Sequence, residues 1–386
     1  MTASRDALPA LLGWWRDGQA CALATVVGTW SSAPRQPGAS MLVGPDGSAV
    51  GSLSGGCVEG DVYAVAEQVL ADGAAVSRRY GVSDAEAAEV GLTCGGIIDV
   101  FVERIDRAGF AELESVVADV DAGRPVAVAT VVRHPDPALV GRRLVVRPDH
   151  GPVATLGSPR RDEAVVDDAR GLLTAGHAGL LTYGPDGQRR GQGLEVFVAT
   201  YAPRARMLVF GATDHAAAVA ALGSFLGYRV TVCDARPVFA TASRFPGADE
   251  VVVDWPHRYL RAQAEQGLLD ERTAVCVLSH DPKFDVPVLE VALRLPRLGY
   301  VGAMGSRRTA DRTLAALRAL GLGERELSRL SSPVGLDLGA RTPEETAVSV
   351  AAEIIAARQG RGAQPLRLVA GPIHGEAGPV GGVSGV

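Results

Sequence analysis

One cysteine stands in a glycine-rich turn, just where a helix is expected to begin. Gly55 and Gly56 precede Cys57, Glu59 follows it, and a helical pattern of apolar residues runs from Val62 to Leu70. Exposed amides and the positive end of a helix dipole favour the thiolate form of a cysteine in such a place. A thiolate can ligate a soft metal, or accept a sulfur atom and pass it on. These four residues are therefore a candidate site, although a lone cysteine is more often an inert small hydrophobe.

A second cysteine also lies beside paired glycines. Cys94 precedes Gly95, Gly96 and a strand expected at Ile97–Val102. Two such loops in one domain can converge on one site, so Cys57 and Cys94 are candidate metal ligands. The sequence alone does not establish that they meet.

The second half opens with a turn between a buried strand and an Ala-rich helix, where a dinucleotide-binding fingerprint would lie. Gly211 permits the tight turn, and Asp234 ends the next strand, where a carboxylate can hold a ribose diol. Thr213 replaces the middle glycine of the fingerprint, and its β-carbon should crowd a pyrophosphate. The pattern predicts a nucleotide-type fold but leaves open whether it binds a dinucleotide or is kept for packing and another ligand.

Polar residues follow two later strands of this half, namely Ser279, His280 and Asp281 after Ala274–Leu278, and Ser306 and Arg307 after Tyr300–Ala303. Ligands meet open α/β sheets at the carboxyl ends of their strands. The first cluster is thus a candidate binding site, and the second a candidate anion pocket at a helix start. The simpler alternatives are a satisfied histidine near a turn and a capped, solvated helix end.

These candidates have to be positioned by two domains. Residues 1–202 mix a hairpin (Met41–Leu53), other strands and helices, which predicts an α+β domain carrying the cysteine turn. Residues 203–358 alternate strand and helix, which predicts a Rossmann-like domain with a doubly wound parallel sheet. Residues 359–386 are rich in Gly and Pro and are expected to form a loose tail. No internal repeat is evident.

Composition excludes several classes of protein. The 386 residues are 47% hydrophobic and 21% charged, as in globular proteins, and a net charge of −6 argues against nucleic-acid binding. The five cysteines form no C-x-x-C pair, which excludes zinc ribbons and dense disulfide scaffolds and favours a reducing compartment. Without a membrane span or export signal in the sequence, we expect a cytoplasmic protein.

The motifs together resemble the XdhC/CoxI (CoxF) family. Its N-terminal domain is similar to two stretches, Ser31–Met41 and Gly51–Gly60. Its C-terminal Rossmann domain is similar to the Gly211 turn, Asp234–Phe239 with Arg244–Ala248, Ser279–Asp281 and Tyr300–Thr309. The likeness runs in order through both domains, from about Ala20 to Leu320.

The resemblance implies an accessory protein of molybdenum hydroxylases such as xanthine dehydrogenase or carbon monoxide dehydrogenase. It implies transient binding of the molybdenum cofactor (molybdopterin), sulfuration of that cofactor with a cysteine desulfurase, delivery to the apo-subunit, and a homodimer. Cys57 would contact molybdenum or its sulfur, and the Rossmann domain would hold the pterin phosphate, although Thr213 departs from the family's usual glycine. The chain would be a maturation factor rather than the catalytic dehydrogenase subunit.

Two alternatives stay open. A stand-alone NAD(P)-dependent oxidoreductase would use Asp234 for the ribose and His280 or Asp281 as proton carrier. A cofactor-free scaffold would only bridge the desulfurase and the enzyme.

Overall fold

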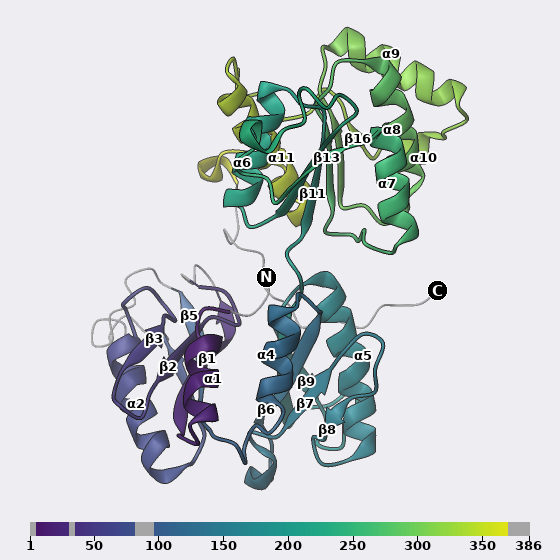
Figure 1. Ribbon diagram of the computed structural model, residues 1–386. Coiled ribbons are helices and arrows are strands. Elements are labelled where there is room, and N and C mark those ends of the chain that lie inside the picture. The colour runs from purple at the N-terminus through teal and green to yellow at the C-terminus, as the bar shows by residue number, and fades with distance from the viewer. Residues whose placement is uncertain (1–4, 31–34, 82–95, 370–386) are drawn as a thin grey trace. The chain divides into compact units, whose positions relative to one another are not determined.

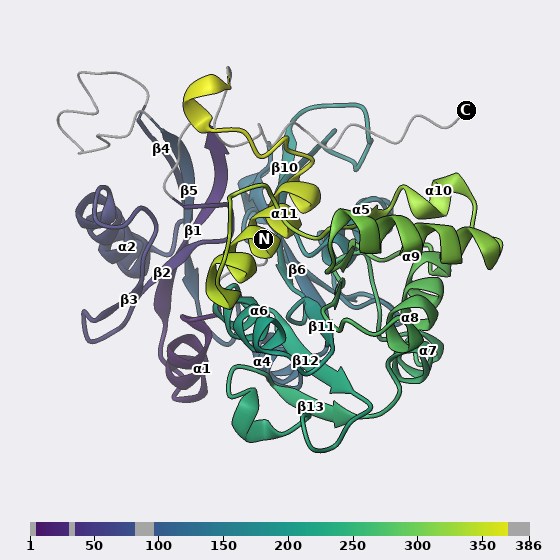
Figure 2. The same cartoon turned by 90° about the horizontal axis from the view of Figure 1, so that it is seen from above.

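The computed structural model describes residues 5–30, 35–81 and 96–369, in two compact units. Unit 1 ends at Pro203, and unit 2 runs from Arg204 to Val369 (Figures 1 and 2). The predicted fold class is confirmed, because unit 1 holds antiparallel sheets with helices and unit 2 a parallel Rossmann-like sheet. Cys94, Ser31–Pro34 and the tail beyond Val369 lie outside the described residues. Within the described part, no helix combines the length and the apolar character that a membrane span requires.

Unit 1 contains two five-stranded antiparallel sheets, with strand orders β3-β2-β1-β5-β4 and β8-β7-β6-β10-β9. The first sheet and its helices are α1 (Leu8–Arg16), β1 (Cys21–Trp30), β2 (Ser40–Val43), β3 (Ala49–Gly51), α2 (Glu59–Asp72), β4 (Val76–Tyr80) and β5 (Ile97–Ile105). The second set is α4 (Leu113–Asp121), β6 (Val126–Arg133), the 3-10 turn η1 (Pro137–Leu139), β7 (Arg143–Val146), β8 (Val153–Ala154), α5 (Pro159–Ala175), β9 (Gly179–Tyr183) and β10 (Leu194–Tyr201).

The central strands of each of these sheets are buried on both faces. Helix α2 covers the outer face of the first sheet, and α5 covers that of the second (Figure 1). The inner faces pack on each other, so that Val26 contacts the α2 layer while its neighbour Val27 packs with Phe197 of the opposite sheet. Burial on both faces explains why β1 and β6 are continuous apolar runs rather than alternating ones. Helices α1 and α4 share one core cluster with both sheets.

Unit 1 consists of two copies of one arrangement, the first copy from Leu8 to Ile105 and the second copy from Leu113 to Tyr201. In the described residues, and apart from the 3-10 turn η1, both copies have the same order of helices and strands along the chain and the same order of strands in the sheet. The amide of Gly38 donates to Val26 in the first copy, as the amide of Gly141 donates to Val131 in the second. The expectation of no internal repeat is therefore wrong.

Unit 2 has one six-stranded parallel sheet of order β13-β12-β11-β14-β15-β16. Helices α6 and α11 cover one face, and α7 to α10 cover the other (Figure 1). Its elements are β11 (Arg206–Phe210), α6 (Asp214–Phe225), β12 (Arg229–Asp234), η2 (Ala242–Arg244), β13 (Glu250–Val253), α7 (Pro256–Glu265), β14 (Ala274–Val277), α8 (Pro282–Arg294), β15 (Tyr300–Ala303), α9 (Arg307–Ala319), α10 (Glu324–Leu327), β16 (Leu330–Ser331), α11 (Pro343–Gln359) and η3 (Leu366–Leu368).

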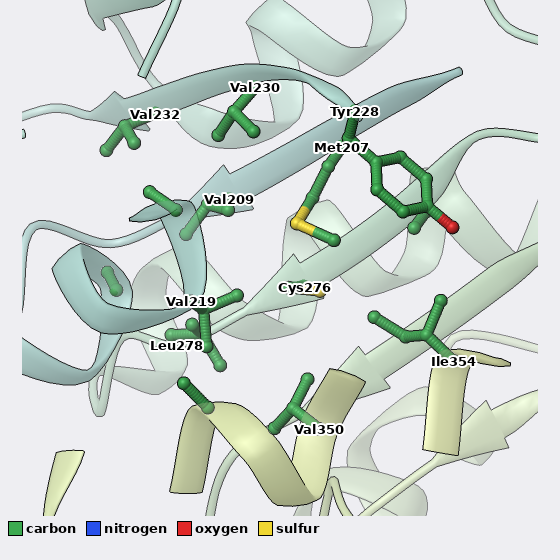
Figure 3. Close-up of a cluster of buried hydrophobic side chains, with 14 of the residues drawn as sticks. Met207, Val209, Val219, Tyr228, Val230, Val232, Cys276, Leu278, Val350 and Ile354 are labelled. Carbon is green, nitrogen blue, oxygen red and sulfur yellow. The ribbon is translucent and has the colours of Figure 1, made fainter. Parts of the chain in front are cut away.

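The core under α6 and α11 holds the central strands in place. Val219 of α6 and Val350 and Ile354 of α11 are buried with Met207 of β11 in one cluster (Figure 3). Gly223 lies inside α6 because a β-carbon there would come 2.5 Å from the sulfur of Met207. This packing fixes the strand whose carboxyl end carries the predicted glycine turn.

Candidate functional site

The predicted cysteine turn is a tight loop between β3 and α2. Gly55 and Gly56 have φ of +84° and +120°, a backbone region that side-chain-bearing residues rarely adopt. A β-carbon at either glycine would meet no atom within 4 Å, so backbone conformation rather than space requires glycine here. Helix α2 begins at Glu59, three residues before the predicted start at Val62.

The carboxylate of Glu59 fills the centre of this loop. It accepts hydrogen bonds from five backbone amides and two hydroxyls, at 2.6 to 3.2 Å, contributed by Ser52, Leu53, Ser54, Gly55, Gly56 and Val58. Burial alone would raise the pKa of this carboxyl, but the hydrogen bonds from Ser54 and Ser52 outweigh burial and hold the pKa well below its usual range. Glu59 is therefore ionised and engaged inside the protein.

Cys57 is half-buried on this loop and packs against the core beneath α2. Its own amide donates to the hydroxyl of Ser54 at 2.9 Å. Every amide from Leu53 to Val58 thus donates within the loop. The expectation that the amides of this turn are exposed beside the sulfur is wrong, because Glu59 and Ser54 accept hydrogen bonds from them.

The second copy has a counterpart of the loop between β8 and α5. There Asp162 accepts from the hydroxyl of Thr155 at 2.7 Å and from the amide of Leu156 at 2.8 Å. Glu59 receives the matching pair from Ser52 and Leu53. The counterpart loop contains no cysteine.

The site residues predicted in unit 2 all lie at the carboxyl-terminal ends of strands of its one sheet. Strands β12, β11, β14 and β15 are neighbours, and they carry Asp234, Gly211, the His280 cluster and the Ser306 cluster at their carboxyl ends. The sheet order reverses between β11 and β14, which is the topological switch point where such folds bind ligands.

The glycine turn is shaped by the neighbouring strand end. Gly211 has φ +111°, and a β-carbon there would lie 2.6 Å from the amide nitrogen of Ser279. Thr213 caps α6 by accepting from the amide of Ala216, and its hydroxyl donates to the carbonyl of Leu278 at 3.3 Å. The threonine therefore ties the turn to β14 at the switch point.

Asp234 is buried and fully engaged. Its carboxylate accepts from the amide of Ala212 at 2.7 Å, and from the amide and guanidinium of Arg236 at 2.7 to 2.9 Å. Burial acts to raise its pKa, but these hydrogen bonds lower it below the ordinary value. A ribose diol would have to displace Arg236 to reach this carboxylate.

One member of the cluster after β14, Ser279, forms a buried pair with a carboxylate. The hydroxyl of Ser279 donates to Asp285, and both side chains are buried. Burial raises the pKa of Asp285 to about 6, against the hydrogen bond from Ser279, which lowers it. Sequence reasoning named both Asp281, which caps α8, and Asp285, which lies four residues later and one turn into that helix.

Ser306 and His280 have the features of the simpler alternatives, which were a capped, solvated helix end and a histidine near a turn. Ser306 caps α9 by accepting from the amide of Thr309 at 3.1 Å, and Arg307 is the first, exposed residue of that helix. His280 is exposed at the end of β14. Among the described residues, no group of three or more His, Cys, Asp and Glu is arranged to hold a metal ion.

One polar feature of unit 1 was not foreseen. Glu103 on β5 and Arg143 on β7 form an ion pair of 2.5 Å between the two sheets, with side chains 8% and 5% exposed. They line a cavity of about 60 Å³ whose other walls are mainly apolar. Cys57 does not line this cavity.

Comparison with known proteins identifies relatives of both units. The sequence model described as XdhC and CoxI family matches residues 14–81 and 120–184, one stretch in each copy of unit 1, and the XdhC Rossmann domain matches residues 207–354. A Bacillus subtilis (strain 168) protein, named as a probable subunit of xanthine dehydrogenase, is 31% identical, over 91% of this chain and 96% of that protein. The Escherichia coli (strain K12) molybdenum cofactor insertion chaperone PaoD is 27% identical, over 92% and 88%. A crystal structure described as a xanthine dehydrogenase from Bacillus halodurans has a TM-score of 0.67 and 25% identity, over 92% and 96%.

Proposed function

The chain belongs to the XdhC and CoxI family, as its motifs predicted, and from that premise we propose that it binds molybdenum cofactor and supports insertion of the cofactor into a molybdoenzyme. The relative named as a molybdenum cofactor insertion chaperone supports this, because it aligns with both units. The cofactor is then cargo that is handed on, and the chain is a maturation factor rather than a catalytic component.

The Cys57 loop is the observation that carries the proposal. Its amides and Glu59 satisfy one another, so the thiol is the group of this loop that remains to meet a ligand. A single thiol can add one soft ligand to a metal that arrives with its organic cofactor, without forming a closed metal site. A single protein ligand suits transient binding, and we propose that Cys57 contacts the molybdenum or its sulfur.

We assign the anionic end of the cofactor to unit 2. The guanidinium groups of Arg236 and Arg244 lie over the ring of Phe239, at 4.9 and 5.7 Å, and Arg244 also donates to the carbonyl of Ala212 in the glycine turn. An aromatic ring flanked by two cations suits a flat ligand with a phosphate group. Arg307, at the start of α9 after β15, is a further cation at the carboxyl ends of the strands of this sheet.

The partners follow from this function. We propose an apo-subunit of the xanthine dehydrogenase or carbon monoxide dehydrogenase type as recipient, a cysteine desulfurase as sulfur donor, and a homodimer as the working form. These three assignments remain predictions, as does the cytoplasmic location.

Titration of the purified chain with molybdenum cofactor, and separately with NAD(P)H, tests the proposal. We expect the cofactor to bind and Cys57→Ala to weaken its binding at least about tenfold, since one metal–thiolate contact is lost. Cys21→Ala removes a buried thiol of the same unit and is the matched control, expected to bind as the wild type does. Absence of cofactor binding by the wild-type chain, or equal affinity of the Cys57 variant, contradicts the proposal.

The same titration separates the oxidoreductase alternative. Tight NAD(P)H binding with turnover would support it. The engagement of Asp234 by Arg236 and the bond from Thr213 to Leu278 count against it, because both occupy places that a dinucleotide needs. If the chain binds neither molybdenum cofactor nor NAD(P)H, the cofactor-free scaffold is the alternative that remains.

A further inference from the structure

We infer that Glu59 is the positioning residue of the proposed cofactor site, because its carboxylate holds the loop that carries Cys57 in one conformation. This inference deepens the proposed function and rests on it only where cofactor binding is concerned. Glu59 itself is then neither a metal ligand nor a proton carrier, because its oxygens are occupied by donors of the loop.

The first argument is the dependence of the whole loop on one side chain. The amides of Leu53, Ser54, Gly55, Gly56 and Val58 all point to the Glu59 carboxylate, at 2.9 to 3.2 Å. Backbone amides without an acceptor are strongly disfavoured in folded proteins. Two consecutive left-handed glycines keep no fixed conformation by themselves, so loss of the central acceptor frees the segment that places the thiol.

The second argument comes from the second copy. Asp162 makes the two contacts that anchor the carboxylate to the preceding strand end, to Thr155 and Leu156. It is one methylene shorter than Glu59. The first copy keeps these anchors through Ser52 and Leu53, and Glu59 reaches further, to Gly56 and Val58. The anchor is thus common to both copies, and the longer reach occurs where the loop carries a cysteine.

The comparison separates a structural from a positioning contribution within one side chain. Anchoring to the strand end supports the fold in either copy. The hydrogen bonds that Glu59 accepts from Gly55 and Gly56 fix the conformation of the Gly55–Cys57 segment. In this conformation Cys57 packs against the core under α2. Shortening the side chain should therefore release the thiol and leave the fold intact.

Glu59→Asp tests this directly, because it gives the first copy the carboxylate of the second. The rate at which iodoacetamide alkylates Cys57 is measured by peptide mass spectrometry, which resolves this thiol from the other cysteines. We expect a rise of about tenfold, since charge-assisted hydrogen bonds that hold the loop closed are lost. The thermal unfolding midpoint should stay close to that of the wild type, and the affinity for molybdenum cofactor should fall.

Two further variants complete the test. Asp162→Asn weakens the corresponding anchor in the second copy and is expected to leave Cys57 alkylation unchanged. Glu59→Gln keeps the side-chain length but removes the charge and replaces one accepting oxygen by an amino group, so it should also raise alkylation. If Glu59→Asp fails to fold, Glu59→Gln provides the test in its place.

Alkylation of Cys57 at the wild-type rate in both Glu59 variants would overturn the inference, as would an equal rise in Asp162→Asn. The measurement needs no cofactor. Failure of the wild-type chain to bind molybdenum cofactor would refute the proposed function and leave the alkylation result standing.

Discussion

Replacement of Glu103 by alanine should cost unit 1 about 3 kcal/mol of its free energy of unfolding. The variant leaves Arg143 buried between the two sheets without its counter-ion, 5% exposed. Breaking a buried ion pair from one side costs about 3 to 5 kcal/mol. Arg143 keeps the carbonyls of Gly109 and Gly141 as acceptors, at 2.8 and 2.9 Å, and the face of Phe110 at 4.8 Å, which places the expected loss at the lower end.

The double variant Glu103→Leu with Arg143→Met should be about as stable as the wild type, or more so. Exchange of a buried ion pair for apolar side chains of similar volume removes the cost of desolvating two charges. The second copy supports this expectation. In the first copy Leu23 of β1 pairs with Glu103 of β5, and at the same place in the second copy Val128 of β6 pairs with Ala199 of β10. The contact between the two sheets therefore does not require a charged residue at this strand position.

The free energies are measured by urea-dependent hydrogen exchange of peptides from β5 and β7, which reports on unit 1 alone. Glu114→Ala is the control, because Glu114 pairs with Arg16 at the surface, where both side chains are more than half exposed. That variant should lose less than about 1 kcal/mol. A loss for Glu103→Ala as small as that of the control, or a double variant as unstable as the single one, would refute the reasoning.

Two further outcomes are expected in unit 2. Asp285→Asn keeps an acceptor for Ser279 and should stabilise the unit at pH 8 by up to about 3 kcal/mol, with little effect at pH 4, in urea unfolding. The folded-state pKa of about 6 lies above the ordinary 3.8, so ionised Asp285 weakens the fold above pH 6, and this cost fades as the pH falls toward 4; a pH-independent effect would contradict this. Gly211→Ala should cost at least about 2 kcal/mol of the free energy of unfolding, because its β-carbon would meet the Ser279 amide at 2.6 Å. Gly227→Ala is the control, also at positive φ but with nothing within 4 Å, and should cost about 1 kcal/mol. Equal losses of stability in the two variants would show that the close approach is unimportant.

Features that depend on local sequence could be predicted. Alternation of short apolar strands with helices predicted the doubly wound sheet. Asp234, His280 and Ser306, which the sequence placed at or after strand ends, lie at the carboxyl ends of strands of this one sheet. The hairpin expected at Met41–Leu53 is β2 paired with β3. In each case the signal lies within a few residues of the element it forms.

Features that depend on register between distant segments could not be predicted. Glu103 and Arg143 are 40 residues apart in the chain, and neither shows a partner in its own neighbourhood. The start of α2 was placed too late because the carboxylate of Glu59 replaces the usual polar cap by folding back over the preceding loop. The repeat was missed because its copies share an order of strands rather than an extended run of identical residues.

The two copies of unit 1 provide an internal comparison that distinguishes folding from function. The edge-strand tyrosines Tyr80 and Tyr183 both donate to a helix aspartate, and α2 and α5 both end at a left-handed glycine. Because these features occur in both copies, the arrangement itself accounts for them. The Gly-Gly-Cys segment occurs in the first copy, whereas the second copy folds its counterpart loop without it. The fold of the second copy therefore gives no reason for Cys57, which is consistent with our proposal that its thiol meets a ligand.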